Sequence, residues 1–241
     1  MPEDWLTSDE AARVLGVTAG RVHALAKSGE LVYRMAGRTR LIDPVSVHRL
    51  LATTRRRAGR PLVPVSAWAA LLSDLGTMNW IEITRSLGMS SQQRYNLKRL
   101  IARTPPESWD ALAKARAIAY RVRARPAYLE EILQWKGVVR SGIAATARYG
   151  LDLIAAEEGD AYVSEETWRL LQREFHLAPH PSGNLVLRIP AVSETHVPVV
   201  LAREVMPVAV VAVDLLDSGD PRSRRTALQI IERLLEAPLH D

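Results

Sequence analysis

The spacing of hydrophobic positions between Thr7 and Gly29 predicts two short helices joined by a tight turn. In "TSDEAARVLGV", apolar residues recur every three or four positions, which is the period of an amphipathic helix. Thr7 followed three residues later by Glu10 has the form of a capping box, and Gly16 is a typical helix end. Thr18 is the expected N-cap of the second helix, which we expect to end at Gly29.

The next segment, "LVYRMAGRTRLI", has the pattern of a β-hairpin with its turn at Ala36 and Gly37. Asp43 followed by Pro44 is an N-cap and first-turn pair, which predicts a third helix over "VSVHRLLATT". The predicted order is therefore helix, turn, helix, hairpin, helix. That order is typical of a winged helix-turn-helix domain.

A change of composition separates this unit from the rest of the chain. The segment "RRRAGRPLVP" combines positive charge with Gly and two prolines, which is typical of a linker. Helical spacing continues through "SSQQRYNLKRLIART" and "ESWDALAKARAIAYRVRARPAYLEEILQW". After Val138, "DAYV", "NLVLRIP" and the β-branched "VMPVAVVAVDLL" favour strands, and "DPRSRRTALQIIERLLEA" favours a closing helix. We therefore expect an α+β protein with a winged helix-turn-helix in residues 1–58, a linker and helical region in 59–136 and an α/β domain in 137–241.

Charge is distributed unevenly along the chain. Residues 1–125 hold 21 Lys/Arg against 10 Asp/Glu, whereas residues 126–241 hold 11 against 17. The basic half favours a polyanionic partner, because each phosphate contact releases condensed counterions. The absence of cysteine excludes disulfides, thiolate metal sites and cysteine nucleophiles. The acidic N-terminus and the shortness of the longest apolar run predict neither a signal peptide nor a membrane span, so we expect a cytoplasmic protein.

The residues predicted to contact double-stranded DNA lie in three places. The start of the second helix would face base edges in the major groove, and arginines near the hairpin tip would reach the DNA backbone or the minor groove. The arginines of the linker form either an extended arm along phosphates or a solvated connection. The candidates are Thr18, Gly20, Arg21, His23 and Lys27 on the helix, Arg34, Arg38 and Arg40 on the hairpin, and Arg55, Arg56, Arg57 and Arg60 in the linker.

The same segment carries a family resemblance. The stretches "LTSDEAARVLGVT", "SGEL", "GRTR" and the Asp-Pro pair at 43–44 resemble the MerR/excisionase-type winged helix domain. The resemblance covers the N-terminal domain and implies sequence-selective DNA binding, with Thr18, Arg21, His23 and Lys27 facing the groove. It does not identify the target sequence.

Asp160 and Asp214 are the two residues to consider for catalysis, because they occupy positions where a nucleotidyltransferase carries acids. "VVRSGIAATARYGLDL" followed by "GDAYV" is distantly similar to the minimal nucleotidyltransferase layout, in which a Gly/Ser turn and a helix precede a strand carrying an Asp-x-Asp pair. Tyr162 stands where the second acid is expected, and two-metal phosphoryl transfer requires grouped carboxylates. His176 and His180 have no carboxylate at metal-ligand spacing. A degenerate nucleotidyltransferase-like scaffold is one interpretation and an active enzyme is the alternative; we expect no catalytic residue, metal or cofactor.

Segments after the linker resemble AbiEi-like proteins, the antitoxins and autorepressors of type IV toxin-antitoxin systems. The most telling are "SGIAATARYGLDL" and "DLLDSGDPR". The resemblance covers nearly the whole chain and implies repression of its own promoter and neutralisation of a nucleotidyltransferase toxin without a stable complex. Binding as a homo-oligomer on repeated DNA sites would tighten repression. The family usually carries a different N-terminal winged helix, so the operator geometry stays open. An excisionase-like factor of a mobile element is the alternative, although that class is usually little longer than its winged domain.

Overall fold

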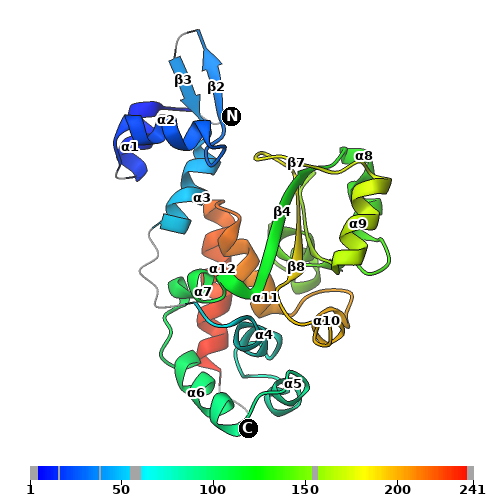
Figure 1. Ribbon diagram of the computed structural model, residues 1–241. Helices are drawn as coiled ribbons and strands as arrows, with labels where there is room; N and C mark the ends of the chain where they lie inside the picture. Colours follow the sequence, from blue (N-terminus) through cyan, green and yellow to red (C-terminus); the bar gives the residue numbers. More distant parts are fainter. Residues whose placement is uncertain (1–4, 16, 38, 55–60, 154–156, 238–241) are drawn as a thin grey trace.

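The computed structural model describes residues 5–15, 17–37, 39–54, 61–153 and 157–237, with the backbone alone for residues 51–54. The N-terminal unit begins with a short strand, which two helices, a hairpin and a third helix follow (Figure 1). The bounds are β1 Leu6–Thr7, α1 Ser8–Leu15, α2 Ala19–Lys27, β2 Tyr33–Ala36, β3 Thr39–Ile42 and α3 Pro44–Thr54. The predicted order of two helices, a hairpin and a third helix is confirmed, and β1 is an additional strand that was not predicted.

The helices of this unit begin at the predicted caps. Thr7 Oγ1 accepts a hydrogen bond from the Glu10 N–H at 3.3 Å, and the Glu10 carboxylate accepts one from the Thr7 N–H at 2.8 Å. Thr18 Oγ1 accepts from the Arg21 N–H at 3.3 Å, and the Asp43 carboxylate accepts two N–H groups from the first turn of α3. Each bond satisfies an N–H that has no partner within its helix.

A hydrophobic core of its own holds the N-terminal unit together. It draws on α1, α2, α3 and the hairpin, and its buried members are Ala11, Ala12, Val22, Leu25, Ala26, Leu31, Ile42 and Val47. The three strands form an antiparallel sheet of order β1-β3-β2 beside it. The unit therefore has the internal packing of a small domain.

The rest of the chain is built around a five-stranded mixed sheet of order β5-β6-β8-β4-β7. β6 and β8 are parallel, and the other neighbouring pairs are antiparallel. The strands are β4 Ala117–Arg123, β5 Val139–Arg140, β6 Gly159–Tyr162, β7 Ala178–Pro179 and β8 Leu185–Pro190. Together with the helices, this sheet confirms the expected α+β class.

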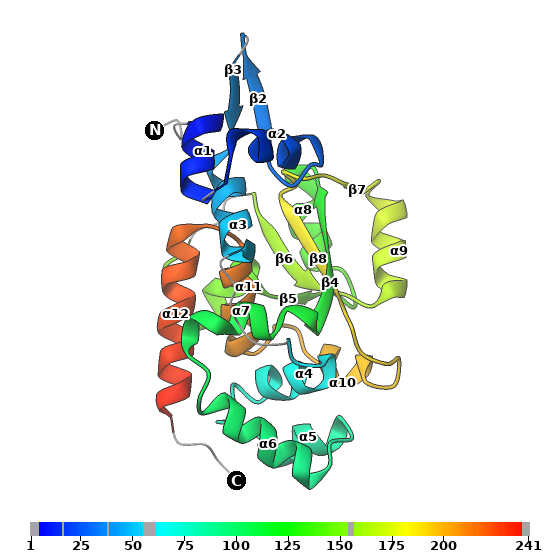
Figure 2. The ribbon, with the colours of Figure 1, turned by 60° about the vertical axis from the view of Figure 1, so that its left-hand side comes forward.

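Helices cover both faces of the larger sheet. Leu133 of α8 and Leu171 of α9 share one core with Leu187 of β8, whereas Tyr162 of β6 lies in the core that surrounds α11. The N-terminal unit lies at one end of the molecule, and α5 and α6 lie at the opposite end (Figures 1 and 2). The α-helices here are α4 Pro64–Leu72, α5 Trp80–Ser86, α6 Ser91–Ile101, α7 Trp109–Leu112, α8 Pro126–Leu133, α9 Glu165–Glu174, α10 Val197–Leu201, α11 Val208–Asp217 and α12 Pro221–Glu236. The 3-10 helices are η1 Pro106–Ser108, η2 Lys114–Arg116 and η3 Gly142–Tyr149.

The prediction of helical structure throughout residues 107–135 is wrong for residues 117–123. This segment is β4, which pairs with β8 from Ala117 opposite Pro190 to Val122 opposite Leu185. Its Ile, Tyr and Val favour a strand, but the alanines and arginines between them also fit helical spacing, so periodicity alone is ambiguous. The sheet and its core therefore extend across the boundary expected after residue 136.

The prediction of a strand in "VMPVAVVAVDLL" is also wrong, because residues 208–217 form α11. All residues from Ala209 to Leu216 are buried, so protein surrounds this helix on every side. A helix of this kind has no polar face, and its continuous apolar run cannot be distinguished from a buried strand by periodicity. Tertiary packing thus overrides the β-propensity of its valines. No helix in the described part of the chain is long and apolar enough to cross a membrane.

Candidate functional site

α2 presents a polar face to solvent, because its apolar face is held in the N-terminal core. Val22, Leu25 and Ala26 are buried. The five residues predicted on this helix are all exposed: Thr18, Gly20, Arg21, His23 and Lys27. A helix with a free polar face at its N-terminal end can enter the major groove and place those side chains against base edges.

Gly20 has no role in the packing of the described chain. A Cβ atom at this position would meet only Thr18 Oγ1, at 3.9 Å, and the backbone does not adopt a positive φ. Glycine inside a helix costs about 0.5–1 kcal/mol relative to alanine. Gly20 therefore makes α2 less stable than alanine would, but it leaves the backbone of the first turn uncovered. An uncovered helix N-terminus can be approached closely by an anionic group.

His23 is held within the domain. Its Nε2 atom lies 3.1 Å from the Ser8 Oγ, so the imidazole links α2 to the start of α1. Arg21 and Lys27, in contrast, form no side-chain hydrogen bond or ion pair with the described residues. Of the charged or titratable candidates on α2, these two have side chains that are free to contact a partner.

The hairpin places its arginines on aromatic rings. The Cζ atom of Arg34 lies 4.6 Å from the centroid of the Trp5 ring, and that of Arg40 lies 4.6 Å from the centroid of the Tyr33 ring. The strand register sets Met35 directly opposite Arg40 on the same face. Stacking of this kind restricts the direction of a guanidinium group. In Arg40 the Nε–H is buried without a hydrogen-bond partner among the described residues, so only the terminal N–H groups of this side chain can contact a partner.

The two aromatic residues beneath these arginines, Trp5 and Tyr33, were not among the residues predicted to contact DNA. The signal for Tyr33 lies in "VYRMAGRTR", where an aromatic residue shares the hairpin with basic residues. Trp5 precedes the first helix and gives no such pattern. The remaining predicted contacts lie outside the described residues: Arg38, Arg55, Arg56, Arg57 and Arg60.

The order of elements, the free polar face of α2 and the basic hairpin together indicate a known kind of domain. Residues 5–55 match the family model of the helix-turn-helix domain. No curated protein and no solved structure matches the chain. The helix-turn-helix domain supports DNA binding, and its match ends before the larger sheet begins.

A second group of polar side chains lies buried between the larger sheet and α11. It consists of Asp160 and Tyr162 on β6, Arg188 on β8, Asp214 on α11, and Arg116 just before β4. Arg116 Nη2 donates to Asp214 Oδ1 at 2.5 Å, and its Nε donates to the Tyr162 hydroxyl at 2.9 Å. Arg188 donates to Asp160, and its Nε lies 3.3 Å from Asp214 Oδ1. Both carboxylates are therefore paired with arginines.

Burial and neighbouring charge determine protonation in this cluster. Burial raises the pKa of Asp160 to about 7, although the charge of Arg188 acts to lower it. Burial also raises the pKa of Tyr162, so the phenol stays neutral and donates to Asp214 Oδ1 at 3.0 Å. Burial acts to lower the pKa of Arg188, but the carboxylates of Asp160 and Asp214 outweigh it and keep the guanidinium charged.

The cluster accounts for the Ser-Gly motif at the start of η3, in which Ser141 is the N-cap and Gly142 is the first residue. Ser141 Oγ donates to Asp214, and Gly142 has a φ of +44°. A Cβ atom on Gly142 would lie 2.6 Å from Asp160 Oδ2, so only glycine fits there. The structure brings Asp160 and Asp214 together, as the nucleotidyltransferase layout requires, but Asp214 lies on a helix and not on a later strand.

Arginine pairing does not suit two-metal chemistry. Such a site needs several carboxylate oxygens free to bind Mg²⁺, whereas here Arg116 and Arg188 occupy them. Among the described residues, no group of three or more His, Asp or Glu side chains could hold a metal ion. The arrangement is that of an ion-pair network that joins the sheet to α11.

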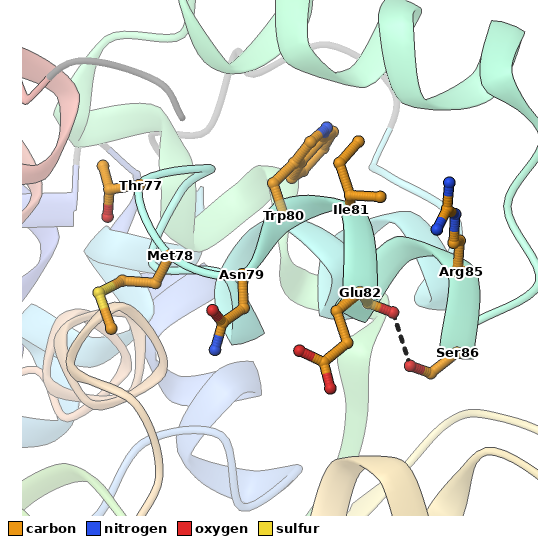
Figure 3. Close-up of a pocket in the computed structure, with 8 residues that line it drawn as sticks. All are labelled: Thr77, Met78, Asn79, Trp80, Ile81, Glu82, Arg85 and Ser86. Atoms are coloured by element: carbon orange, nitrogen blue, oxygen red, sulfur yellow. Dashed lines mark hydrogen bonds between the residues drawn. The ribbon is translucent and has the colours of Figure 1, made fainter. Parts of the chain in front are cut away.

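A hollow beside α5 brings no functional groups together. It is lined by residues 77–82, 85 and 86, which all belong to α5 and the turn before it. Trp80 and Ile81 point to one side of the helix, and Asn79 and Glu82 to the other (Figure 3). The hydrogen bond marked there is local, from the Ser86 hydroxyl to the Glu82 carbonyl at 2.7 Å. We assign this hollow no function.

Proposed function

We propose that the chain is a transcriptional regulator that reads an operator with α2 and holds the DNA backbone with the hairpin. The observation that carries this proposal is the exposed face of α2, where Arg21 and Lys27 have no partner among the described residues. Arg21 in the first turn is placed for a base edge, and a bidentate arginine–guanine contact contributes about 1–3 kcal/mol of discrimination. Arg34 and Arg40 are the phosphate contacts.

The test is a selection of duplexes from a random pool by the full chain, followed by binding measurements on the enriched sequence. We expect Arg21→Ala to lose about tenfold or more of the preference for that sequence over a scrambled duplex, because a base contact is removed. Arg40→Ala should weaken binding to both duplexes alike, because a phosphate contact carries no sequence information.

Arg169→Ala is the matched control. Arg169 is an exposed arginine on α9 that, among the described residues, forms an ion pair only with Glu165 of the same helix, and its loss should change neither affinity nor preference. Enrichment of no sequence by the wild-type chain, or an Arg21→Ala variant with full preference, would refute the proposal. Enriched sites that contain two half-sites would indicate binding as a homo-oligomer.

We further propose that this regulator is the autorepressing antitoxin of a type IV toxin-antitoxin pair. The support is the resemblance of "SGIAATARYGLDL" and "DLLDSGDPR" to AbiEi-like proteins, and the contact between these motifs at Ser141 and Asp214. Under this proposal the promoter is the chain's own, and a neighbouring reading frame encodes a nucleotidyltransferase toxin.

Co-expression with the neighbouring reading frame tests this second proposal. We expect the full chain to protect cells from the neighbour's product and Arg21→Ala to protect them equally, because neutralisation would not use the DNA-reading face. An integrase as the neighbour, or toxicity unchanged by the full chain, would favour the excisionase-like alternative.

We also propose that the chain transfers no nucleotide. The pairing of Asp160 with Arg188 and of Asp214 with Arg116 supports this. Metal-dependent nucleotide incorporation by the full chain that Asp160→Ala abolishes would contradict it.

A further inference from the structure

A cavity of about 460 Å³ lies where the helix-turn-helix domain meets the larger sheet. Val45 and Arg49 of α3 form one wall, and Arg121 of β4, Val186 of β8 and Asp160 of β6 form another. Its volume is within the range of small-molecule sites, which is about 300–1,000 Å³. The cavity is separate from the exposed face of α2.

The strand register explains why charged groups gather in this cavity. Asp160 pairs with Val186 across the β6–β8 ladder, and Val186 pairs with Arg121 across the β8–β4 ladder. Directly paired residues share a face of the sheet, so the three side chains form a row toward the cavity. The carboxylate of Asp160 is paired with Arg188 and forms no ion pair with Arg121, although its charge still acts on Arg121.

Arg49 and Arg121 carry positive charge that no described carboxylate pairs with. Arg121 Nη1 donates to the Gly183 carbonyl at 2.8 Å, and Arg49 Nε donates to the Ser218 carbonyl at 3.5 Å. Neither arginine forms an ion pair with a described residue. Both side chains are half-buried, and their positive charges repel each other, so an anion between them would relieve that repulsion.

The pKa values of Arg49 and Arg121 are both lowered, as expected for arginines that have no ion pair with a described residue. Burial, and then the charge of Arg49, lower the pKa of Arg121 to about 10. Burial also lowers the pKa of Arg49, against the charges of Asp43 and Glu158. Glu158 is exposed, so water screens its charge.

We propose that this cavity binds a small organic phosphate, whose phosphate group lies between Arg49 and Arg121. Two guanidinium groups match the charge of a phosphate monoester and can each donate two parallel hydrogen bonds. The organic part would pack on the apolar wall, which Ile143, Leu153, Val186 and Leu215 supply. Carboxylates of Asp152 and Glu158 also line the cavity and are placed to accept hydrogen bonds from hydroxyl or amino groups.

The ligand would also regulate DNA binding, an extension that rests on the proposed function. Arg49 belongs to the helix-turn-helix domain and Arg121 to the larger sheet, so a phosphate held by both joins the two parts of the molecule. A ligand changes a conformational equilibrium only through a difference in affinity between the two states. Here the state with α3 against the sheet is the one that binds the ligand.

Isothermal titration of the full chain, without DNA, tests the site. The probes are adenosine 5′-monophosphate, cytidine 5′-monophosphate, glucose 6-phosphate, inorganic phosphate and adenosine. We expect at least one phosphate compound to bind and adenosine not to bind. Arg121→Gln and Arg49→Gln should each weaken that binding about tenfold or more, because each removes a charge-assisted hydrogen bond. Equal binding of inorganic phosphate and the phosphate esters would assign the site to free phosphate.

Matched controls are Arg123→Gln and His48→Gln. Arg123 is exposed on the same strand and bonds to Ser182, and His48 is exposed on the same helix as Arg49. Neither substitution should change the affinity, and circular dichroism of all variants checks the fold. Absence of binding by every phosphate compound at millimolar concentration would overturn the site. So would wild-type affinity in both Arg49→Gln and Arg121→Gln.

The regulatory extension has its own measurement, which is the affinity for the selected duplex with and without the compound that binds. We expect the compound to change the duplex affinity of the wild-type chain about tenfold and that of Arg121→Gln by less than about twofold. Unchanged affinity in the wild type would remove the regulation and leave the site. A chain that binds no duplex would instead refute the proposed function, while the titration result would stand.

Discussion

Gly20 and Gly142 both lie at helix starts, but different constraints act on them. Gly142 has a φ of +44° and faces Asp160, so the protein's own packing requires a glycine there. Gly20 has an ordinary backbone and open space around it. A residue that weakens its own helix without an internal reason is best explained by a partner that approaches it closely.

We predict that Gly20→Ala separates stability from function. The variant should raise the free energy of unfolding by about 0.5–1 kcal/mol, because alanine restricts the unfolded chain and favours helix. It should also weaken binding to the selected duplex, because the added methyl group lies where the backbone approaches DNA. Thermal denaturation and fluorescence anisotropy measure the two effects.

The matched control for Gly20→Ala is Ala24→Gly on the same exposed helix. It should lower the free energy of unfolding by a similar amount and leave the affinity for the duplex unchanged, because it adds no atoms to the exposed face. A Gly20→Ala variant with unchanged affinity would show that α2 does not bring its backbone close to phosphate.

Asp160 makes stability depend on pH. Its folded-state pKa of about 7 lies above its ordinary value of 3.8, so the folded state holds a proton that the unfolded state has lost. The stabilisation from protonated Asp160 is therefore complete below pH 4 and is lost as the pH rises to 7.

Asp160→Asn removes this titration, and urea denaturation between pH 4 and 7 measures the result. We expect the stability of the wild type relative to the variant to fall as the pH rises across this range. A relative stability that rises toward pH 7 would show instead that Arg188 stabilises an ionised Asp160.

At the scale of elements, local sequence determines some parts of the fold and tertiary packing determines others. Caps are local, so Thr7, Thr18 and Asp43 mark helix starts that the structure reproduces. β4 and α11 were assigned wrongly because their surroundings decide their conformation. The strand partners of β4 are β8 and β7, more than fifty residues later in the chain, and α11 is buried on every side.

The hairpin is the element whose contribution to DNA affinity should depend most on salt. Arg40→Gln should reduce the slope of log affinity against log salt concentration by about one, because one phosphate contact is lost. Tyr33→Leu should weaken binding less and leave the slope intact, since it removes the ring under Arg40 but not the charge. Titrations at several salt concentrations distinguish these effects, and equal slopes for wild type and Arg40→Gln would exclude a phosphate contact.

At the scale of the molecule, the two candidate sites differ in how far sequence could predict them. The exposed face of α2, which we propose reads DNA, follows from helical periodicity, since Val22 and Leu25 are buried and Arg21 is left exposed. The cavity needs residues from α3, β4, β6 and β8 that are far apart in the chain. Arg49 and Arg121 carry no local motif, so only the strand register and the docking of α3 reveal them.

Gly219 lies at a close contact between the helix-turn-helix domain and the rest of the molecule. It has a φ of +81°, and a Cβ atom there would lie 2.8 Å from the Cβ of Arg49. We predict that Gly219→Ala separates α3 from the turn between α11 and α12 and speeds amide hydrogen exchange in α3. Gly150→Ala is the control, because it has the same kind of backbone strain, a φ of +61°, with nothing within 4 Å. Equal exchange in the two variants would show that the contact with Arg49 is unimportant.

The position of Trp5 has an optical consequence. Five of the six tryptophans follow residue 60, and Trp5 alone lies in the helix-turn-helix domain, beneath the guanidinium of Arg34. When Arg34 turns toward a phosphate, the indole of Trp5 loses its cationic neighbour and its emission should change. The difference spectrum between the wild type and Trp5→Phe therefore isolates a signal from the DNA-binding end of the molecule, with no label attached.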